Sequence, residues 1–288
     1  MFTGWDEHCL VEEELSRIKG QLPESVLGDV IAYILSAPGK RVRPLLLLLS
    51  CQAFGGSAEQ ALRAAMAVEL AHAASLVHDD LLDCGTRRRG SPTVLERFGP
   101  EAALLAGDYL ISRSMDLISC YSQPIIRSFA GACMSMADGE MRDLSTASTP
   151  EEYFKCISRK TGSLFAASAR IGVLIAGARE EDAAQLELYG VHLGLGYQVL
   201  DDLEEYLGID QGKSSKKVSV TLPRIYSQIF PGQAREMCIR FIEDQVGMAR
   251  RALRDASGRE DVKLRLEGIL DEMIQRGLQR CRLQESLC

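Results

Sequence analysis

Two short acidic clusters stand out in this chain, because each lies within an apolar stretch that has helical spacing. The first belongs to the segment LVHDDLLDCGTRRRGSP, residues 76–92, and its carboxylates are Asp79, Asp80 and Asp83. Asp79 and Asp83 are four residues apart and therefore project from the same face of a helix. Such a pair can hold Mg²⁺, which prefers carboxylate oxygens and keeps water or substrate phosphate among its ligands. Taken alone, the pattern more often marks a solvent-facing acidic turn, but the apolar flanks argue against one here.

The second acidic cluster lies in the segment GYQVLDDLEEYLG, residues 196–208, and contains Asp201, Asp202 and Glu205. Asp201 and Glu205 again share one helix face. Either cluster is weak evidence by itself. Together they predict two facing helices with metal ions held between them.

Basic residues gather at two further places. Residues 39–44 read GKRVRP and precede a predicted helix, Leu45–Leu49, with Pro44 as its first residue. Cations at a helix N-terminus oppose its dipole, so a cluster there makes sense if an anion binds beside the free amides. An exposed basic loop is the alternative. Lys160 and Thr161 supply a further cation and a hydroxyl within an apolar helix.

Two acidic groups and separate basic groups suit a reaction between two anionic substrates, one of them bound through metal. The arginines that follow Asp83 then need not neutralise the aspartates. Arg88 and Arg89 can both serve phosphates instead.

Helical periodicity runs through nearly the whole chain, whereas regular alternation of β-branched residues is missing. Ser57 with Gln60 predicts a capping box, and Thr149 followed by Pro150 predicts another helix start. No repeat and no linker divides the chain. We therefore expect one all-α domain over residues 1–288, built from roughly ten or more helices.

Two segments differ from the rest of this pattern. Residues 208–219, GIDQGKSSKKVS, are polar and lysine-rich and are expected to form a mobile loop. The tail from residue 236 to 288 has amphipathic helical spacing with mixed charge, which is typical of a solvated packing face.

Composition excludes several classes of protein. The chain of 288 residues has a net charge of −7 and a pI near 5.3, which argues against nucleic acid as a partner. Its nine cysteines form no CxxC pair, as expected for reduced thiols in a cytoplasmic protein. The acidic N-terminus is no signal peptide, and the longest apolar stretch, 164–178, is too short to span a bilayer. We expect a soluble protein.

In its ordered motifs the chain resembles the trans-isoprenyl diphosphate synthases, or polyprenyl synthetases. The similarity runs from about Gly39 to Tyr226 and leaves helices over 227–288 beyond it. The motifs that carry it are GKRVRP, HAASLVHDDLLD, RRG-S-P, AGDYL, KTG, GYQVLDD and TLP, in the family's order. The resemblance implies an all-α bundle around a central cavity and a homodimer. It also implies stepwise elongation of an allylic diphosphate with isopentenyl diphosphate.

The resemblance further assigns roles to individual residues. It implies catalytic roles for Asp79, Asp80, Asp83, Asp201, Asp202 and Lys160, with three Mg²⁺ ions held by diphosphate and by Asp79, Asp83 and Asp201. Isopentenyl diphosphate would contact Lys40, Arg43, His72 and Arg89. The allylic diphosphate would contact Arg88, Lys160, Thr161, Gln198 and one loop lysine, Lys213 ahead of Lys216 or Lys217. For His72, a packed core histidine is the alternative.

The chain departs from the family in two places. Glu205 stands where the family usually has aspartate, and the loop before Thr221 is shorter than usual. A terpene cyclase needs only one diphosphate site and leaves GKRVRP unexplained. A non-catalytic synthase subunit is expected to lose acidic motifs, and this chain keeps both.

Small residues before the first aspartate bear on product length. In the family, a bulky aromatic four or five residues upstream of that aspartate closes the cavity of short-chain enzymes. Here those positions are Ser75 and Ala74, and Ala71 and Ala67 continue the small-residue stripe. We therefore expect geranylgeranyl diphosphate or a longer product, with farnesyl diphosphate as the alternative. If the alanines only let a neighbouring helix pack closely, the cavity floor comes from elsewhere, with Met115, Phe129 or Met134 as candidates.

Overall fold

The computed structural model describes residues 2–144, 149–209 and 220–283, and these form fourteen α-helices with one short hairpin. The helices are α1 (Asp6–Lys19), α2 (Val26–Ser36), α3 (Val42–Ala53), α4 (Ala58–Leu82), α5 (Val94–Phe98), α6 (Pro100–Ile118), α7 (Gln123–Asp143), α8 (Pro150–Ile157), α9 (Ser163–Ile175), α10 (Glu180–Tyr206), α11 (Leu222–Ile229), α12 (Ala234–Asp255), α13 (Glu260–Leu270) and α14 (Arg276–Leu283). Two π-helical turns, η1 (Ser158–Gly162) and η2 (Asp271–Gln275), precede α9 and α14. The all-α prediction is confirmed.

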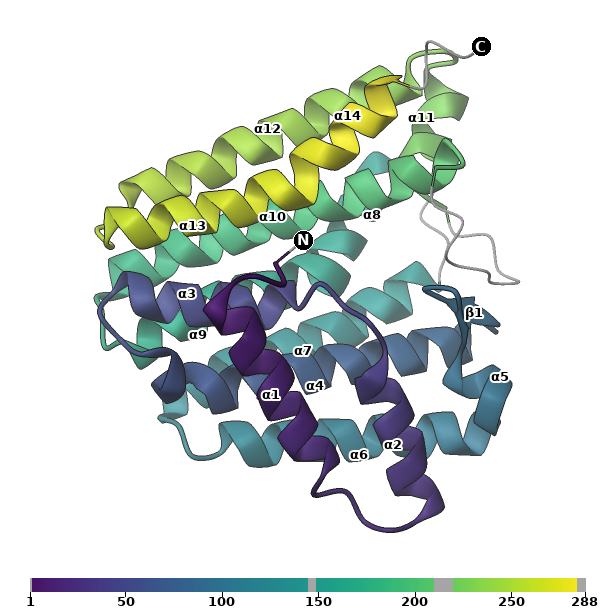
Figure 1. The fold of residues 1–288 in the computed structure, drawn as a ribbon. Coiled ribbons are helices and arrows are strands. Elements are labelled where there is room, and N and C mark those ends of the chain that lie inside the picture. The colour runs from purple at the N-terminus through teal and green to yellow at the C-terminus, as the bar shows by residue number, and fades with distance from the viewer. Residues whose placement is uncertain (1, 145–148, 210–219, 284–288) are drawn as a thin grey trace.

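Helix α9 lies at the centre of the bundle, where it packs against α3, α4, α7 and α10 (Figure 1). Nine of its thirteen residues are buried, as expected for a helix that is apolar on almost every side. Helices α4 and α10, which carry the two acidic clusters, therefore lie on either side of α9. The terminal helices α12, α13 and α14 run over α10.

Glycines let these helices approach closely. A Cβ atom on Gly172 of α9 would lie 2.3 Å from the carbonyl oxygen of Leu47 in α3. A Cβ atom on Gly190 of α10 would lie 2.5 Å from the carbonyl oxygen of Phe165 in α9. Each glycine costs its helix about 0.5–1 kcal/mol relative to alanine, and the close packing it permits offsets that cost.

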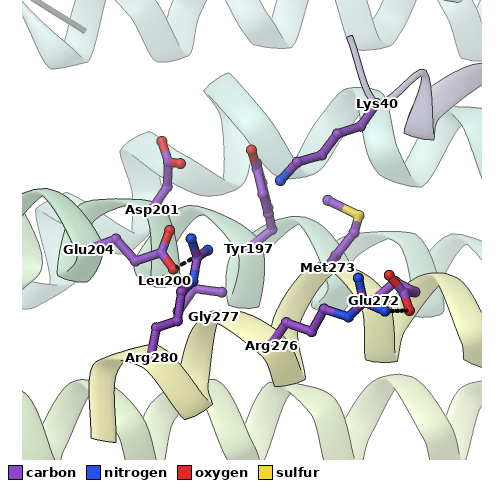
Figure 2. A pocket seen from close by; sticks show the side chains of 10 residues that line it. All are labelled: Lys40, Tyr197, Leu200, Asp201, Glu204, Glu272, Met273, Arg276, Gly277 and Arg280. Carbon is purple, nitrogen blue, oxygen red and sulfur yellow. Dashed lines mark ion pairs between the residues drawn. The ribbon is translucent and has the colours of Figure 1, made fainter. Parts of the chain in front are cut away.

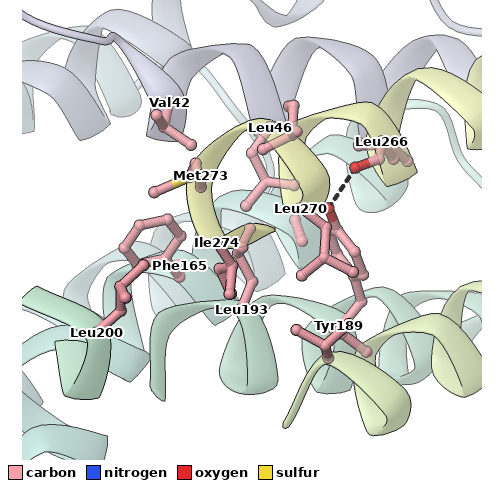
Figure 3. Packing of buried hydrophobic residues seen from close by; sticks show 14 of the residues in the cluster. Val42, Leu46, Phe165, Tyr189, Leu193, Leu200, Leu266, Leu270, Met273 and Ile274 are labelled. Carbon is pink, nitrogen blue, oxygen red and sulfur yellow. Dashed lines mark hydrogen bonds between the residues drawn. The ribbon is translucent and has the colours of Figure 1, made fainter. Parts of the chain in front are cut away.

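The C-terminal helices share a core with the helices that carry the motifs (Figure 3). Side chains of α3, α9, α10 and the α13–η2 segment interlock there, including Leu46, Phe165 and Ile274. The buried hydroxyl of Tyr189 is satisfied there, because it donates to the carbonyl oxygen of Leu266 at 2.6 Å. Residues 227–283 thus extend the same core.

Helix starts follow the predicted capping residues in two cases. Ser57 and Gln60 form the reciprocal capping box, and the Thr149 hydroxyl accepts a hydrogen bond from the Glu152 amide. The predicted start of α3 is wrong, because this helix begins at Val42 and not at Pro44. Proline is tolerated anywhere in a first turn, where its missing N–H has no partner to lose. Arg43 therefore lies within the helix and not before it.

The hairpin was not predicted. Strands β1 (Arg87–Arg88) and β2 (Ser91–Pro92) pair antiparallel, and Arg89 and Gly90 form the turn with φ of 50° and 78°. Such short strands leave no alternating pattern that a sequence would reveal. In the described part of the chain, no helix is long and apolar enough to cross a membrane.

Candidate active site

The first acidic cluster ends helix α4. Asp79 and Asp80 lie in its last turn, and Asp83 caps it with an amide that donates to the Asp79 carbonyl oxygen at 2.9 Å. The predicted spacing of one helical turn between Asp79 and Asp83 is therefore kept. Asp80 and Asp83 are buried.

Asp79 lies within a group of charges formed by three helical segments. Lys160 of η1 makes ion pairs with Glu140 at 2.5 Å and Asp143 at 2.8 Å, both from α7. Burial raises the pKa of Asp79 to about 7, with Glu140 adding to the rise and Lys160 opposing it. The three carboxylates also raise the pKa of Lys160 against the effect of burial. Lys160 is thus a fully paired cation in a region that remains acidic.

Gly139 explains why α7 and η1 meet here. A Cβ atom on Gly139 would lie 2.3 Å from the amide nitrogen of Lys160, so only glycine permits this backbone contact. The π-helical turn presents Lys160 and Thr161 at the same point. π-Turns within helices are frequent at functional sites.

Asp80 faces away from this group and binds Arg88. The Arg88 Nε donates to both carboxylate oxygens, at 3.1 and 2.9 Å, and its Nη2 lies 2.9 Å from Oδ1. Asp80 raises the pKa of Arg88 against the effect of burial, and Asp79 and Asp201 act in the same direction. Arg88 therefore does pair with one of the aspartates, and its predicted contact with a substrate phosphate stays a prediction. A buried carboxylate needs such a partner.

The second cluster divides in a similar way. Asp202 is buried and accepts hydrogen bonds from Tyr153 at 2.6 Å and from Gln198 at 2.9 Å. Gln198 in turn accepts one from Thr161 at 2.8 Å. Burial raises the pKa of Asp202 to about 7, and the hydrogen bonds from Tyr153 and Gln198 oppose this rise. Asp202 thereby anchors the predicted substrate groups Gln198 and Thr161.

Asp201 lines a cavity of about 350 Å³ between α10 and the C-terminal helices (Figure 2). Lys40 reaches into it and lies over the ring of Tyr197, 5.5 Å from the ring centroid. On the C-terminal side Arg276 pairs with Glu272 at 2.6 Å, and Arg280 of α14 pairs across the cavity with Glu204 of α10 at 2.7 Å. Glu205 points elsewhere, 3.6 Å from Arg224.

A separate cationic cluster lies beside this cavity. The Arg43 Nη1 is 3.0 Å from His72 Nε2, and its guanidinium carbon lies 4.3 Å from the Phe165 ring centroid. Burial lowers the pKa of Arg43 to about 10. Burial lowers the pKa of His72 well below its usual value, and Arg43 and Arg89 lower it further. Among the residues that the structure describes, no carboxylate forms an ion pair with Lys40, Arg43 or Arg89.

Arg89 joins this cluster from the turn of the hairpin. Its Nη1 donates to the carbonyl oxygen of Pro38 at 2.5 Å. Two-residue turns of this kind favour Asn, Asp or Gly because of the positive φ. The backbone of an arginine at φ 50° is strained, and such strain is typical of functional positions.

The small-residue stripe of α4 is packed tightly. Ala67, Ala71 and Ala74 are at most 3% exposed and belong to one buried cluster with residues of α6, α7 and α9. Ser75 is half-buried, one turn before Asp79. Of the larger candidates, Phe129 is buried, whereas Met115 and Met134 are exposed on this chain.

The sequence model of the polyprenyl synthetase family matches residues 24–226. The chain belongs to that family. A geranylfarnesyl diphosphate synthase from Methanosarcina mazei is 44% identical over 225 residues, which are 77% of this chain and 76% of that protein. A geranylgeranyl diphosphate synthase from Sulfolobus acidocaldarius is 34% identical over 242 residues, 79% of this chain and 70% of that one. The crystal structure of a geranyltranstransferase from Methanosarcina mazei has a TM-score of 0.85 at 38% identity, covering 96% of this chain and all of that one.

As a polyprenyl synthetase, this chain is a prenyltransferase of isoprenoid synthesis, and prenyl diphosphates and Mg²⁺ dependence are typical of its family. In the part of the chain that the structure describes, no three His, Cys, Asp or Glu side chains come close enough to hold a metal ion unaided. The donor set nevertheless fits Mg²⁺. Lys160 pairs with Glu140 and Asp143, and Asp79 acts on it through its charge, so carboxylate oxygens, which Mg²⁺ prefers, are in excess over positive charge.

Several residues of this synthetase site were missed by the sequence reasoning. They are Glu140 and Asp143 beside Lys160, Tyr153 beside Asp202, and Tyr197, Arg276 and Arg280 in the cavity. Glu140 and Asp143 alternate with Met141, Arg142 and Leu144 near the end of α7, so in the sequence they resemble an ordinary solvated helix end. Lys213, Lys216 and Lys217 lie outside the described residues, and their assignment stays a prediction.

The depressed pKa of His72 predicts a pH dependence of stability. The unfolded chain takes up a proton near pH 6.5, and the folded chain does so only at much lower pH. Stability contributed by neutral His72 is therefore lost as pH falls below 6.5, at up to about 1.4 kcal/mol per pH unit. In urea unfolding at pH 7 and pH 5, His72→Gln should show a smaller difference than the unmutated chain. Equal differences would mean that His72 is not held neutral.

Proposed function

We propose that this chain condenses isopentenyl diphosphate with an allylic prenyl diphosphate in a Mg²⁺-dependent reaction and makes an all-trans polyprenyl diphosphate. One observation carries the proposal. The site has an acidic end, where Lys160 is outnumbered by carboxylates, and a cationic end, where Arg43 and Arg89 have no carboxylate partner among the described residues. Two anionic substrates are thus bound by different means, one through metal and one directly.

At the acidic end, Asp79 and Asp83 on α4 and Asp201 on α10 are the residues proposed to hold Mg²⁺, with three ions expected. Bound Mg²⁺ would stabilise the charge that develops on the departing diphosphate. Lys160, Arg88, Thr161 and Gln198 are proposed to orient the allylic diphosphate. Tyr153 and Asp202 hold Gln198 and Thr161 in place for this task.

At the cationic end, Arg43, Arg89, Lys40 and His72 are proposed to bind isopentenyl diphosphate. Phe165 lies against the guanidinium of Arg43, and His72 contacts its Nη1. These contacts hold Arg43 in position without neutralising it. A diphosphate would supply the missing negative charge.

Chemistry between the two ends follows from charge and proximity. The allylic C–O bond ionises, and the C=C bond of isopentenyl diphosphate attacks the resulting carbocation to form the new C–C bond. A proton is then lost to the released diphosphate, which leaves a trans double bond. No side-chain nucleophile is required.

Replacing Asp79 by alanine tests the metal assignment. Loss of a ligand that positions the leaving-group metal should cost several kcal/mol of barrier, so turnover should fall roughly a thousandfold or more. Turnover would be measured with isopentenyl diphosphate, an allylic diphosphate and Mg²⁺. Glu205→Ala is the matched control, because Glu205 lies near Arg224 and should change turnover little. Near-normal turnover of Asp79→Ala would contradict the proposal that Asp79 holds Mg²⁺.

The two ends should also separate kinetically. Arg43→Ala or Lys40→Ala should raise the KM for isopentenyl diphosphate about tenfold or more while leaving the allylic KM nearly unchanged, since a charged hydrogen bond contributes about 1.5–3 kcal/mol. Lys160→Ala should mainly affect the allylic substrate. Steady-state kinetics with each substrate varied in turn would show this. If all three variants weakened the same substrate, the two-site proposal would fail.

We propose geranylgeranyl diphosphate or a longer product. The relatives named as geranylfarnesyl and geranylgeranyl diphosphate synthases support this. So do the small residues Ser75 and Ala74, which stand four and five residues before Asp79, where an aromatic residue would close the cavity.

Introducing an aromatic side chain tests the product-length proposal. Ser75→Phe and Ala74→Phe should both shorten the product toward farnesyl diphosphate, with metal dependence unchanged. Ala74 is 1% exposed, so its replacement should also destabilise the fold by about 1–3 kcal/mol, whereas Ser75 is half-buried and should tolerate the ring. Chromatography against prenyl alcohol standards would report the product. Unaltered products in both variants would place the chain-length determinant elsewhere.

We expect the active form to be a homodimer. Helix α6 exposes Leu104, Ile111 and Met115 at helical spacing, and Met134 and Met141 of the neighbouring α7 are exposed as well. Apolar side chains gathered in this way are typical of a protein–protein interface. Sedimentation equilibrium should report a dimer, and a monomer would show that this apolar face is not an interface between two copies of the chain.

A further inference from the structure

Arg41, the middle cation of GKRVRP, differs from its neighbours because every part of its guanidinium is engaged. Its Nε donates to Glu12 at 2.7 Å, its Nη1 to Glu69 at 2.8 Å and its Nη2 to the Ala37 carbonyl oxygen at 3.0 Å. The side chain is 9% exposed. Each of the three guanidinium nitrogens of Arg41 is therefore already hydrogen-bonded within the protein.

The backbone of Arg41 is also unusual. Arg41 caps the N-terminus of α3 in the left-handed region, at φ 50°, where a non-glycine residue costs of order 1 kcal/mol or more. Its three hydrogen bonds stabilise this conformation. Two residues later, Arg43 emerges from the first turn of α3.

Glu69 is the buried anchor of this arrangement. Its side chain is 7% exposed and lies on α4 three residues before His72, whereas the side chain of Glu12 on α1 is 45% exposed. Exposed ion pairs contribute about 0–1 kcal/mol, but removing one partner of a buried pair typically costs 3–5 kcal/mol. The Glu69 bond therefore fixes Arg41 far more firmly than the Glu12 bond does.

The loop that Arg41 fixes carries the cationic end of the site. Lys40 is its neighbour in the chain, and the Pro38 carbonyl oxygen accepts the hydrogen bond from Arg89. Gly39 lies between the two guanidiniums, since a Cβ atom there would be 3.0 Å from Arg41 Nη1 and 3.2 Å from Arg89 Nη1. Movement of this loop would displace Lys40 and Arg89 together.

We infer that Arg41 and Glu69 are positioning residues for isopentenyl diphosphate: their buried ion pair holds the 37–41 loop so that Lys40, Arg43 and Arg89 converge on one diphosphate. The inference rests on the proposed function and adds two residues to it. Glu69 acts through geometry, because its charge alone would weaken the attraction of an anion to this end.

Glu69→Gln and Glu12→Gln form a matched pair, since each removes one charge from a partner of the same guanidinium. Glu69→Gln should raise the KM for isopentenyl diphosphate at least tenfold and leave the allylic KM within about twofold. Glu12→Gln should change either KM less than about threefold, as expected for an exposed pair. Arg41→Lys, which keeps the charge but loses the fork, should resemble Glu69→Gln.

Calorimetric binding of inorganic diphosphate to the full chain in metal-free buffer gives a second readout, in which Glu69→Gln should bind at least tenfold more weakly than the unmutated chain. Tighter binding by Glu69→Gln, equal effects of Glu69→Gln and Glu12→Gln, or equal loss for both substrates would overturn the inference. If Glu69→Gln does not fold, Arg41→Lys decides by the same criteria. Absence of any isopentenyl diphosphate turnover in the unmutated chain would instead overturn the proposed function.

Discussion

The site depends on buried charges of opposite sign that lie close together in the helical core but only partly neutralise one another. A buried carboxylate or guanidinium normally takes a partner. Asp80 takes Arg88, Glu69 takes Arg41, and Glu140 and Asp143 take Lys160. The Arg41–Glu69 pair removes the carboxylate whose charge acts on Arg43 and Arg89. The remaining cations are then available to an anion from outside.

Backbone geometry decides which charges remain. Arg88 and Arg89 are adjacent and chemically identical, but the pairing register of the hairpin turns Arg88 toward Asp80 and places Arg89 at the turn. Arg41 and Arg43 diverge in the same way at the start of α3. Sequence reasoning predicted the fold, the helical spacing of Asp79 and Asp83 and the grouping of basic residues. It did not predict which arginine would pair with a carboxylate, because a shift of one residue in the register of the hairpin would change the answer.

The sequence also did not predict the contacts between helices that lie far apart in the chain. Glu140 and Asp143 join the site only because Gly139 lets α7 touch the π-helical turn at Lys160. The second π-helical turn, η2, borders the cavity that contains Lys40 and Asp201. Both turns depend on long-range packing. The start of α3 was misplaced for a local reason, since a proline marks the first turn of a helix without specifying its first residue.

The hairpin that carries Arg89 is a small part of the site with few backbone hydrogen bonds of its own. Its strands have two residues each, and beyond their own pairing it is held by side chains: the Arg88–Asp80 pair and the hydrogen bonds from Arg89 to Pro38, from Tyr33 to Pro92 and from Thr93 to Gly85. Elements with so few backbone bonds open locally at low free energy, without unfolding of the helices around them. A ligand that binds Arg89 only in the closed form must raise that opening free energy by mass action. Amide exchange over residues 87–92 would then slow as the neighbouring diphosphate position fills. The exchange rate of this short turn would therefore report whether that position is occupied.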